Sequence, residues 1–517
     1  MRRLAVYIAF VSAAVLIPIV WVWAGDSASG LPEHLEQVDR PAWIHPDYND
    51  VTIPPNIAPL NFRIREQAAR YRVRLAPAGG SPRIDVQGRS ADVILPMDRW
   101  RALLAAARGG QIGVDILTAD KDGRWRQYRG FRIAIAQEPI DSHVAYRLLR
   151  PVYNFYSDLG IYQRNLETYE QSLILHGRQY DRGCLNCHSF RSNDPNRMLL
   201  GVRSMQHGNI TLLADSGRVH AIGMPFGDTA WHPSGKLAAF SRYDVRMFFH
   251  TAAMEVRDVI EMDSLLGYYR VENHRLQTVA PGADKERLET MPVWSPDGRY
   301  LYFISAAKLW TDDKTVPPER FREVRYDLVR AAYDMDSDAW GPVEMVLSAE
   351  QTGKSILSPR LTPDGRFIIV TMCDYSCFPI YRPESDLYLV DPATGRYERL
   401  DCNSDRTDSW HSISSNGRWI IFSSKRDNGV FTRLYIARLD ESGKTSKPFI
   451  MPQKDPGYYD GYLKVYNLPE FITGPVTTPN AAFVRAVRGG ERLKVDALTA
   501  ATPKVDSTPE FWRPRDP

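Results

Sequence analysis

The sequence predicts a mainly β protein, on the basis of its composition and its turn-forming residues. The chain has 517 residues, of which 44% are hydrophobic and 25% charged, as is typical of a globular protein of two to four domains. It contains 36 prolines, 34 glycines and 26 tyrosines, which together favour many short strands joined by tight turns. The 65 basic and 62 acidic residues leave a net charge of +3, so we expect no nucleic-acid partner.

Residues 1–30 predict a membrane anchor or an export signal. Arg2 and Arg3 precede an uncharged apolar stretch from Leu4 to Ala24. A helix of this length spans about 30 Å, whereas a cleaved signal has an apolar core of roughly 7–15 residues. We therefore expect an uncleaved helix that leaves the arginines in the cytoplasm and places the remainder on the periplasmic side of the inner membrane. A cleaved signal is the alternative, and it also exports the chain to the periplasm.

Residues 31–140 predict a small β-sandwich-like domain. A Pro- and Asp-rich linker is followed by runs of alternating polarity, such as Tyr71–Leu75 and Gln111–Ile116. One short helix is expected from Met97 to Arg108.

The spacing of the apolar residues changes at residue 141. Segments such as 146–149 and 161–166 have helical spacing, so we expect a short helical segment over residues 141–200. At the other end of the chain, residues 481–517 predict an irregular tail, since four prolines fall in the last sixteen residues.

Residues 201–480 contain four copies of one unit, a turn followed by an apolar strand. Proline presets φ, Asp, Asn or Ser hydrogen-bonds its own backbone, and glycine supplies a positive φ. A radial array buries such sheets without long exposed edges, so the repeats predict a C-terminal β-propeller. The copies are Trp231–Phe240, Trp294–Phe303, Leu361–Val370 and Ile413–Phe422.

These units resemble the WD40-like (PD40) repeats of TolB-like β-propeller proteins, over residues 201–475. Segments 403–406, 411–419 and 423–427 further resemble bacterial proteins in which such a propeller follows an N-terminal c-type cytochrome segment. The resemblance implies the fold of the C-terminal region, and it implies no settled activity.

One motif carries defined chemistry. Cys184-Leu-Asn-Cys187-His188 is the Cys-x-x-Cys-His signature of c-type haem attachment. Cys184 and Cys187 would form thioethers with the haem vinyl groups, and His188 would be the proximal ligand of the iron. The alternatives are a disulfide or redox pair and half of a zinc site. The chain offers no second Cys/His pair and no thioredoxin-like βαβ setting for either. We expect one covalent haem c.

The distal ligand is less clearly indicated, because Met198, Met205, His207, His220 and Met224 all follow the motif closely. In the related proteins the run after the motif often reads Met-Leu-Phe-His-Met-Arg, whereas this chain has Met-Leu-Leu-Gly-Val-Arg over residues 198–203. Met198 is retained and is therefore our first candidate, with simple core packing as the alternative. An iron without a sixth ligand would permit small-ligand or peroxide chemistry.

The remaining cysteines and two histidines have structural interpretations. Cys373 and Cys377 flank a short loop and predict a local disulfide in an oxidising compartment, which would leave Cys402 unpaired. A metal site formed by Cys373, Cys377 and His411 is the less favoured alternative, because the spacing fits no zinc template. His232 and His411 adjoin the repeat turns, where structural hydrogen bonding is favoured over a role on the propeller axis.

The function expected from these features is one-electron transfer. We found no nucleophile elbow, phosphate loop or dinucleotide-binding motif, so an electron carrier or binding protein is favoured over an enzyme. The prediction is a membrane-tethered periplasmic monohaem cytochrome c whose propeller docks redox partner proteins. The alternatives are a protein-binding scaffold with a structural or sensory haem, and a haem peroxidase or oxidase.

Overall fold

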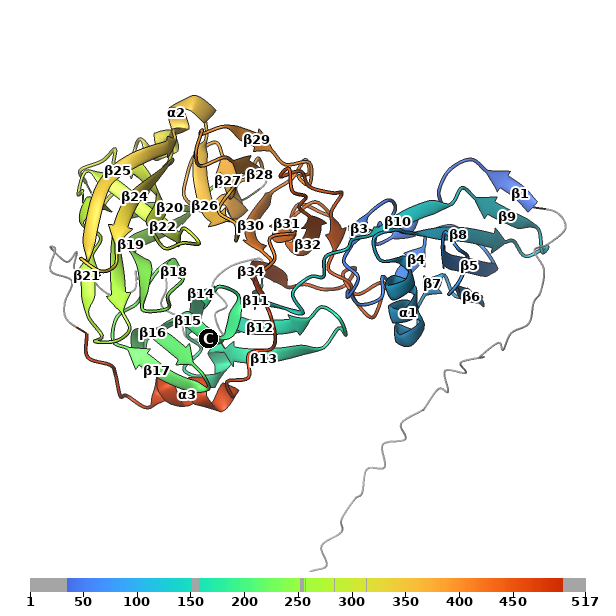
Figure 1. The fold of residues 1–517 in the computed structure, drawn as a ribbon, viewed down its shortest axis with the longest axis horizontal. Coiled ribbons are helices and arrows are strands. Elements are labelled where there is room, and N and C mark those ends of the chain that lie inside the picture. The colour runs from blue at the N-terminus through green and yellow to red at the C-terminus, as the bar shows by residue number, and fades with distance from the viewer. Residues whose placement is uncertain are drawn as a thin grey trace, which may run out of the picture.

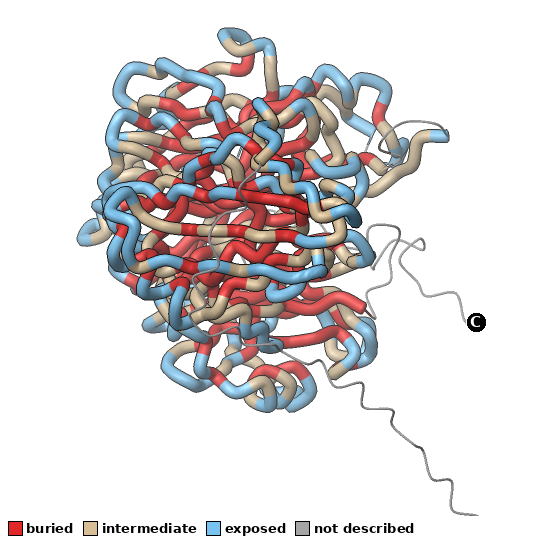
Figure 2. The backbone as a smooth tube through the Cα atoms, turned by 90° about the vertical axis from the view of Figure 1, so that its right-hand side faces the viewer, coloured by how far each residue is buried: buried red, intermediate tan, exposed pale blue. Residues whose placement is uncertain are grey.

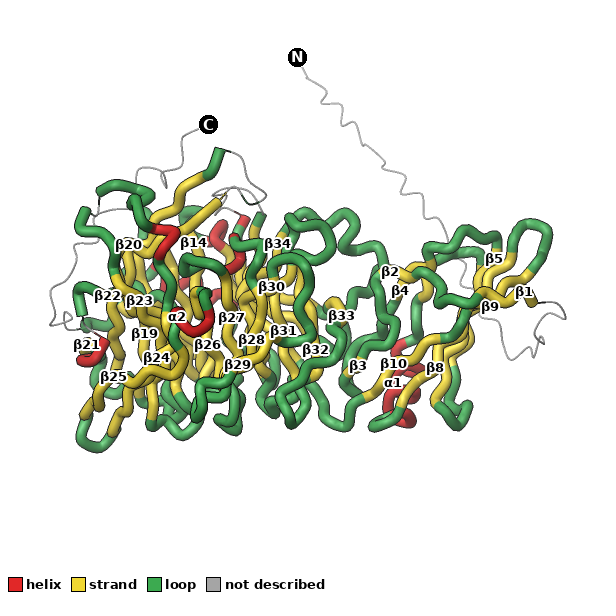
Figure 3. Tube along the Cα trace, turned by 90° about the horizontal axis from the view of Figure 1, so that it is seen from above, coloured by secondary structure: helices red, strands yellow, loops and turns green. Residues whose placement is uncertain are grey.

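The computed structural model describes residues 35–150, 158–251, 255, 257–282, 284–312 and 314–495. An N-terminal domain lies beside a larger ring of sheets (Figure 1), and strands dominate both parts (Figure 3). The predicted anchor at residues 1–30 lies outside the described residues. Within the described ranges, none of the helices is long and apolar enough to cross a membrane.

The N-terminal domain is β-rich, as predicted. A seven-stranded mixed sheet and a three-stranded sheet of β2, β4 and β7 make up the domain together with α1. Helix α1 (Met97–Ala107) occupies the predicted position and buries Trp100, Leu103 and Leu104. The strands are β1 (Leu35–Val38), β2 (Ile44–His45), β3 (Thr52–Ile53), β4 (Phe62–Ile64), β5 (Arg70–Pro77), β6 (Ile84–Gly88), β7 (Asp92–Val93), β8 (Gln111–Ala119), β9 (Trp125–Tyr128) and β10 (Phe131–Ile135).

The rest of the described chain forms six four-stranded antiparallel sheets, the blades of a β-propeller. The inner edge strands of successive sheets contact one another around the axis (Figure 1).

Sheet 1 contains β34 (Val465–Ile472), β11 (His143–Leu149), β12 (Gly160–Asn165) and β13 (Gln171–His176). Sheet 2 contains β14 (Cys184–Arg191), β15 (Asp194–Ser204), β16 (Gly208–Asp215) and β17 (Arg218–Ile222). Sheet 3 contains β18 (Thr229–Trp231), β19 (Leu237–Phe249), β20 (Arg257–Arg270) and β21 (Leu276–Thr278). Sheet 4 contains β22 (Arg287–Trp294), β23 (Tyr300–Ala307), β24 (Asp327–Asp334) and β25 (Ala339–Leu347). Sheet 5 contains β26 (Ser355–Leu361), β27 (Ile368–Cys373), β28 (Asp386–Val390) and β29 (Tyr397–Arg399). Sheet 6 contains β30 (Asp408–Ile413), β31 (Trp419–Ser424), β32 (Arg433–Arg438) and β33 (Phe449–Ile450). The short helix α2 (Ala349–Thr352) precedes β26.

The ring is closed by β34, the last strand of the described residues. Strand β34 pairs antiparallel with β11, so that Ile472 lies opposite His143 and Val465 opposite Leu149. Sheet 1 therefore combines strands from the two ends of the propeller sequence, and the two ends are held together by backbone hydrogen bonds.

The four predicted repeat turns are confirmed, and each joins the first two strands of one sheet in sheets 3 to 6. Their glycines all have positive φ, which an L-residue adopts only with strain. Neighbouring turns also touch, since Gly298 abuts the imidazole of His232. All four turns lie at one end of the sheets, and the opposite end carries the longer connections.

The predicted helical segment over residues 141–200 is wrong. The chain forms strands β11 to β15 there, and the helical parts among the described residues are short 3₁₀ turns, at Asp158 and at Gly177–Gln179. Strands β11 and β12 are largely buried on both faces and hold buried polar side chains such as Gln163 and Arg164, so the polar alternation that identifies a strand is absent there. The propeller accordingly begins at β11 rather than at residue 201.

The prediction of an irregular tail from residue 481 is also wrong for the first residues of that segment, which form a helix. Helix α3 (Asn480–Arg488) buries Phe483 and Val487 against sheets 1 and 2. Residues 496–517 lie outside the described part of the chain.

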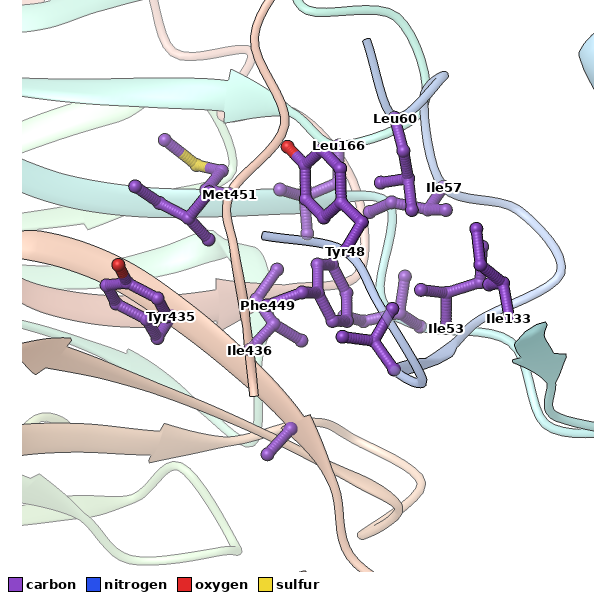
Figure 4. Packing of buried hydrophobic residues seen from close by; sticks show 14 of the residues in the cluster. Tyr48, Ile53, Ile57, Leu60, Ile133, Leu166, Tyr435, Ile436, Phe449 and Met451 are labelled. Atoms are coloured by element: carbon purple, nitrogen blue, oxygen red, sulfur yellow. The ribbon is translucent and has the colours of Figure 1, made fainter. Parts of the chain in front are cut away.

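The N-terminal domain and sheet 6 share one hydrophobic core. Tyr48, Ile53 and Ile57 pack in the same cluster as Ile436 and Phe449 (Figure 4). Burial follows the strands, whereas exposed residues gather at the connections (Figure 2). The two parts are therefore joined by apolar packing.

Candidate functional site

The Cys-x-x-Cys-His motif forms the innermost strand of sheet 2. Strand β14 starts at Cys184 and contacts both β34 and β18 at the propeller axis. Cys184 lies at the end of the ring opposite the repeat turns. The motif is thus at the mouth of the axis, beside the long connections.

A ring of bulges surrounds the axis, and Cys187 belongs to it. The backbone of Cys187 is left-handed, with φ 43°, at a register shift between β14 and β15. Met291, Ser358, Trp410 and Leu468 are left-handed at matching register shifts on β22, β26, β30 and β34. The unusual backbone of Cys187 is therefore a property of the propeller, and it is no sign of function by itself.

Both motif cysteines are free thiols held in protonated form. The Cys187 thiol lies 3.7 Å from a carboxylate oxygen of Asp228 and 3.7 Å from the hydroxyl of Tyr243. Burial and the neighbouring Asp228 carboxyl raise the pKa of Cys187 to about 12. Burial also raises the pKa of Cys184. Because a thiolate is the nucleophilic form, neither cysteine is activated in this fold.

His188 is buried and neutral. Burial, reinforced by the charge of Arg147, lowers the pKa of its imidazole to about 3. The backbone of Ala145 opposes this shift in part, yet neither imidazole nitrogen has a partner in hydrogen-bonding geometry. His411 holds the matching position on β30, and its Nε2 lies 3.0 Å from the carbonyl oxygen of Ile369. At this site in the propeller, one imidazole nitrogen of His411 has a partner and its Nδ1 has none, whereas neither nitrogen of His188 has one.

Arg147 reaches the motif from the neighbouring strand β11. Its guanidinium donates to the side-chain oxygen of Asn186 at 2.9 Å and to the carbonyl of Leu185 at 3.4 Å. Both acceptors belong to the two residues between the cysteines. Its charge and that of Arg203 oppose in part the rise in the pKa of both cysteines that burial causes.

The donor set fits a covalently attached haem, but the strand does not bring the donors together. Two free thiols and an unprotonated imidazole with free nitrogens are the groups that attachment and ligation need. However, Cys187 faces Asp228 and Tyr243 of sheet 3, whereas His188 contacts Phe190, which packs in the cluster shared with sheet 1. Attachment therefore requires a local change in the conformation of β14.

Met198 lies on β15 with none of its surface exposed. It packs in the cluster between sheets 1 and 2, opposite Phe190 in the strand register. Packing in the core is enough to explain a methionine at position 198. The assignment of Met198 as the distal ligand stays a prediction. Among the other candidates, Met205 is 65% exposed and His220 is exposed.

The disulfide expected between Cys373 and Cys377 is not present, since both are buried free thiols, as is Cys402. The Cys373 thiol donates to the carbonyl of Tyr375 at 3.1 Å, while the Cys377 thiol lies 3.9 Å from the carbonyl of Val259. The described residues also hold no group of three or more His, Cys, Asp or Glu side chains that could bind a metal ion.

The structural interpretation of the two histidines is confirmed. His232 contacts the Ser234 hydroxyl at 2.7 Å and the Gly298 carbonyl at 3.1 Å, and so links two repeat turns. His411 links β30 to the second strand of the preceding sheet through its contact with Ile369.

Three residues beside the motif were missed by the sequence analysis, namely Arg147, Asp228 and Tyr243. Each lies on a different segment, about 40 to 55 positions from the cysteine or asparagine it contacts. No local pattern marks them, because only the closure of the ring brings these segments together.

No family model matches the chain, and no curated protein matches it. Solved structures are similar at low identity. A nidogen/laminin complex matches with a TM-score of 0.37 and 10% identity over 64% of this chain and 99% of the other. An oligogalacturonate lyase from Vibrio parahaemolyticus matches with a TM-score of 0.32 and 12% identity over 65% and 87% of the two chains. A puromycin-hydrolysing peptidase from Mycobacterium tuberculosis matches with a TM-score of 0.33 and 13% identity over 65% and 50%. At this level of similarity the neighbours carry no inference about activity, and the β-propeller is established by the strand order itself.

Proposed function

We propose that the protein is a monohaem c-type cytochrome built on a TolB-like propeller. The observation that carries the proposal is the intact motif at the mouth of the axis, where two free thiols precede a neutral histidine whose nitrogens have no partners. Cys184 and Cys187 would hold the haem, and His188 would be its proximal ligand. When bound, the haem supplies one-electron redox chemistry.

The chain's own residues would control the surroundings of the cofactor. Asp228 and Tyr243 lie beside Cys187, and Arg147 donates to Asn186 inside the motif. We propose Met198 as the distal ligand, which requires its side chain to leave the cluster between sheets 1 and 2. The apolar segment over residues 4–24 would tether the protein to the inner membrane with the propeller in the periplasm.

The same end of the ring offers a surface for a redox partner protein. Exposed apolar side chains lie in connections of sheets 2, 4 and 6 and in the connection that leads to β34, all at the end where Cys184 lies: Met205, Val316, Val430 and Leu463. We propose that these separate apolar side chains contribute to the surface that docks the partner protein. This observation also favours the second candidate, a binding scaffold whose haem is structural or sensory.

The test is the covalent haem itself. The full-length protein is produced in a host competent in cytochrome c maturation, and its intact mass and pyridine haemochrome spectrum are measured. We expect a mass increase of one haem, which Cys184→Ala or Cys187→Ala reduces sharply. Cys402→Ala is the matched control, because it removes a buried thiol outside the motif and leaves attachment unchanged. A mature protein with the mass of the bare polypeptide would refute the cytochrome proposal.

Reduction and partner binding separate the two candidates. Reversible one-electron reduction with a six-coordinate low-spin spectrum supports the electron carrier. A haem that resists reduction, combined with a stable complex with one periplasmic protein, supports the scaffold. A high-spin spectrum with exogenous ligand binding would instead support a peroxidase or oxidase.

A further inference from the structure

The hairpin of β19 and β20 extends beyond sheet 3 at the mouth of the axis. Within the sheet, β18 pairs with β19 only at residues 238–240, and β21 pairs with β20 only at residues 267–269. Strands β19 and β20 stay paired with each other well beyond those points, over residues 242–249 and 257–265. These two segments therefore form a two-stranded ribbon outside the sheet, which we call the strap.

The strap crosses the mouth from sheet 3 to the opposite side of the ring. The inner strands of sheets 1 to 6 contact one another in that order and back to sheet 1, so sheet 6 lies opposite sheet 3. Glu255, in the connection between the two strands of the strap, forms an ion pair with Lys425 at 2.6 Å. Lys425 directly follows β31 of sheet 6. The far end of the strap is therefore fixed to the opposite wall of the mouth.

The second strand of the strap is also held by sheet 5, through the connection between β27 and β28. Asp258 has none of its surface exposed, and its carboxylate accepts hydrogen bonds from the Tyr375 hydroxyl at 3.0 Å and from Arg382 at 3.5 Å. The Cys377 thiol lies 3.9 Å from the carbonyl oxygen of Val259 on the strap. The strap thus covers this thiol, and Cys377 is only 4% exposed.

The packing beneath the strap is incomplete on the side of sheet 4. A cavity of about 10 Å³ lies between Glu261 of the strap and the side chains of Trp310 and Tyr326, which belong to the connection between β23 and β24. This volume is close to the least that holds one water molecule. A two-stranded ribbon is only marginally stable by itself, so the position of the strap depends on its contacts with the other sheets.

We propose that the strap is a latched cover over the mouth of the axis, that it opens as a unit, and that the ion pair of Glu255 with Lys425 is its latch. The side chain of Lys425 is 7% exposed, so the loss of Glu255 would leave a buried cation without its partner. Opening exposes Cys377, and it also removes the hydroxyl of Tyr243, which lies 3.7 Å from the thiol of Cys187. A protein that acts on Cys187 would therefore meet a more accessible thiol in the open form.

Alkylation of Cys377 under native conditions measures the opening. In the full-length protein, with or without haem, we expect Lys425→Met to raise the rate of Cys377 alkylation about tenfold, because the far end of the strap loses its ion pair. Lys425→Arg keeps the charge and should restore most of the protection. Cys402 is the internal reference, since it is fully buried in the connection before β30. The matched control is Lys447→Met, which breaks a more exposed pair with Asp47 and should leave the rate unchanged.

Hydrogen exchange tests whether the strap moves as a unit. In Lys425→Met the amides of residues 242–249 and 257–265 should exchange faster by a common factor, while those of the adjoining inner strand β22 keep their rate. If Lys425→Met fails to fold, Glu255→Gln breaks the same pair from the side of the strap. Where both variants fold, the double variant should be little faster than either, because the two changes remove one interaction.

The outcomes are distinguishable. A rate of Cys377 alkylation that neither Lys425→Met nor Glu255→Gln raises would overturn the latch. Equal acceleration at Cys377 and Cys402 would show unfolding of the whole propeller, and faster exchange in one strand alone would show that the strap does not move as a unit; either result overturns the proposal. The covalent haem is tested separately by the mass of the mature protein, so the two proposals fail independently.

Discussion

Replacement of Arg433 by methionine is expected to loosen the closure of the propeller. Arg433 lies on β32 and reaches the connection that leads into β34, where it donates to the carbonyls of Tyr462 and Lys464 at 2.7 Å each. Its guanidinium also lies 5.2 Å from the ring centre of Tyr459. A hydrogen bond from a charged donor contributes about 1.5–3 kcal/mol, and methionine leaves both carbonyls without a donor. Since the desolvation of the charge is also removed, we expect a net loss of about 3 kcal/mol.

Native-state hydrogen exchange measures this loss where it acts. The amides of β34 that pair with β11 should exchange about a hundredfold faster in Arg433→Met, and the urea midpoint should fall. Arg418→Met is the control, because Arg418 pairs with Glu441, which is 78% exposed, and such pairs contribute at most about 1 kcal/mol. Equal exchange of β34 in the two variants would refute the reasoning that Arg433 secures the closing strand.

Two further changes test the interior of the ring. Burial raises the pKa of Glu261 from 4.5 to about 8, and its carboxyl accepts a hydrogen bond from Tyr326 at 2.6 Å. Because the pKa of Glu261 is higher in the folded state than in the unfolded state, its contribution to stability is fully present below about pH 4.5 and is lost as the pH rises through 8. We therefore expect Glu261→Gln to reduce the fall of the thermal midpoint between pH 5 and 8. An unchanged pH dependence of the midpoint in this variant would contradict the assignment. Gly298 has φ +74° and abuts His232, so Gly298→Ala should destabilise the protein by about 1–3 kcal/mol in urea unfolding, whereas Gly461→Ala, which has open space for a Cβ, should have little effect. A smaller loss for Gly298→Ala than for Gly461→Ala would show that this turn tolerates a side chain.

The propeller could be predicted from four turns, but its six sheets could not be counted from them. In sheet 1 the inner strand β34 and its neighbour β11 come from opposite ends of the propeller sequence, so no turn joins them. In sheet 2 the equivalent connection is a two-residue hairpin at Ser192 and Asn193, both with positive φ, and it needs neither proline nor glycine. The missing repeats thus have two separate structural causes.

The motif of the candidate site could be predicted from the sequence, but the residues that surround it could not. Cys184, Cys187 and His188 are recognisable because attachment chemistry demands a fixed local spacing. The sequence around them predicts a helix wrongly, because these buried strands carry polar side chains in the interior, such as Gln163 and Ser189, and so lack the alternation of a half-buried strand. The contacts of Cys187 with Asp228 and Tyr243 depend on the packing of sheet 3 against sheet 2, which no short window of sequence encodes.

Closure by the final strand sets an order of events during synthesis. The attachment motif leaves the ribosome about 280 residues before β34 does, which at roughly 5–20 residues per second amounts to about 15–55 s. Until then the inner edge of β11 has no partner, and the adjoining β14 is flanked on one side by an unfinished neighbour. During that interval β11 and β14 lack their contacts with β34, and the two cysteines lie in an incomplete ring; once β34 has paired, the ring around them is closed.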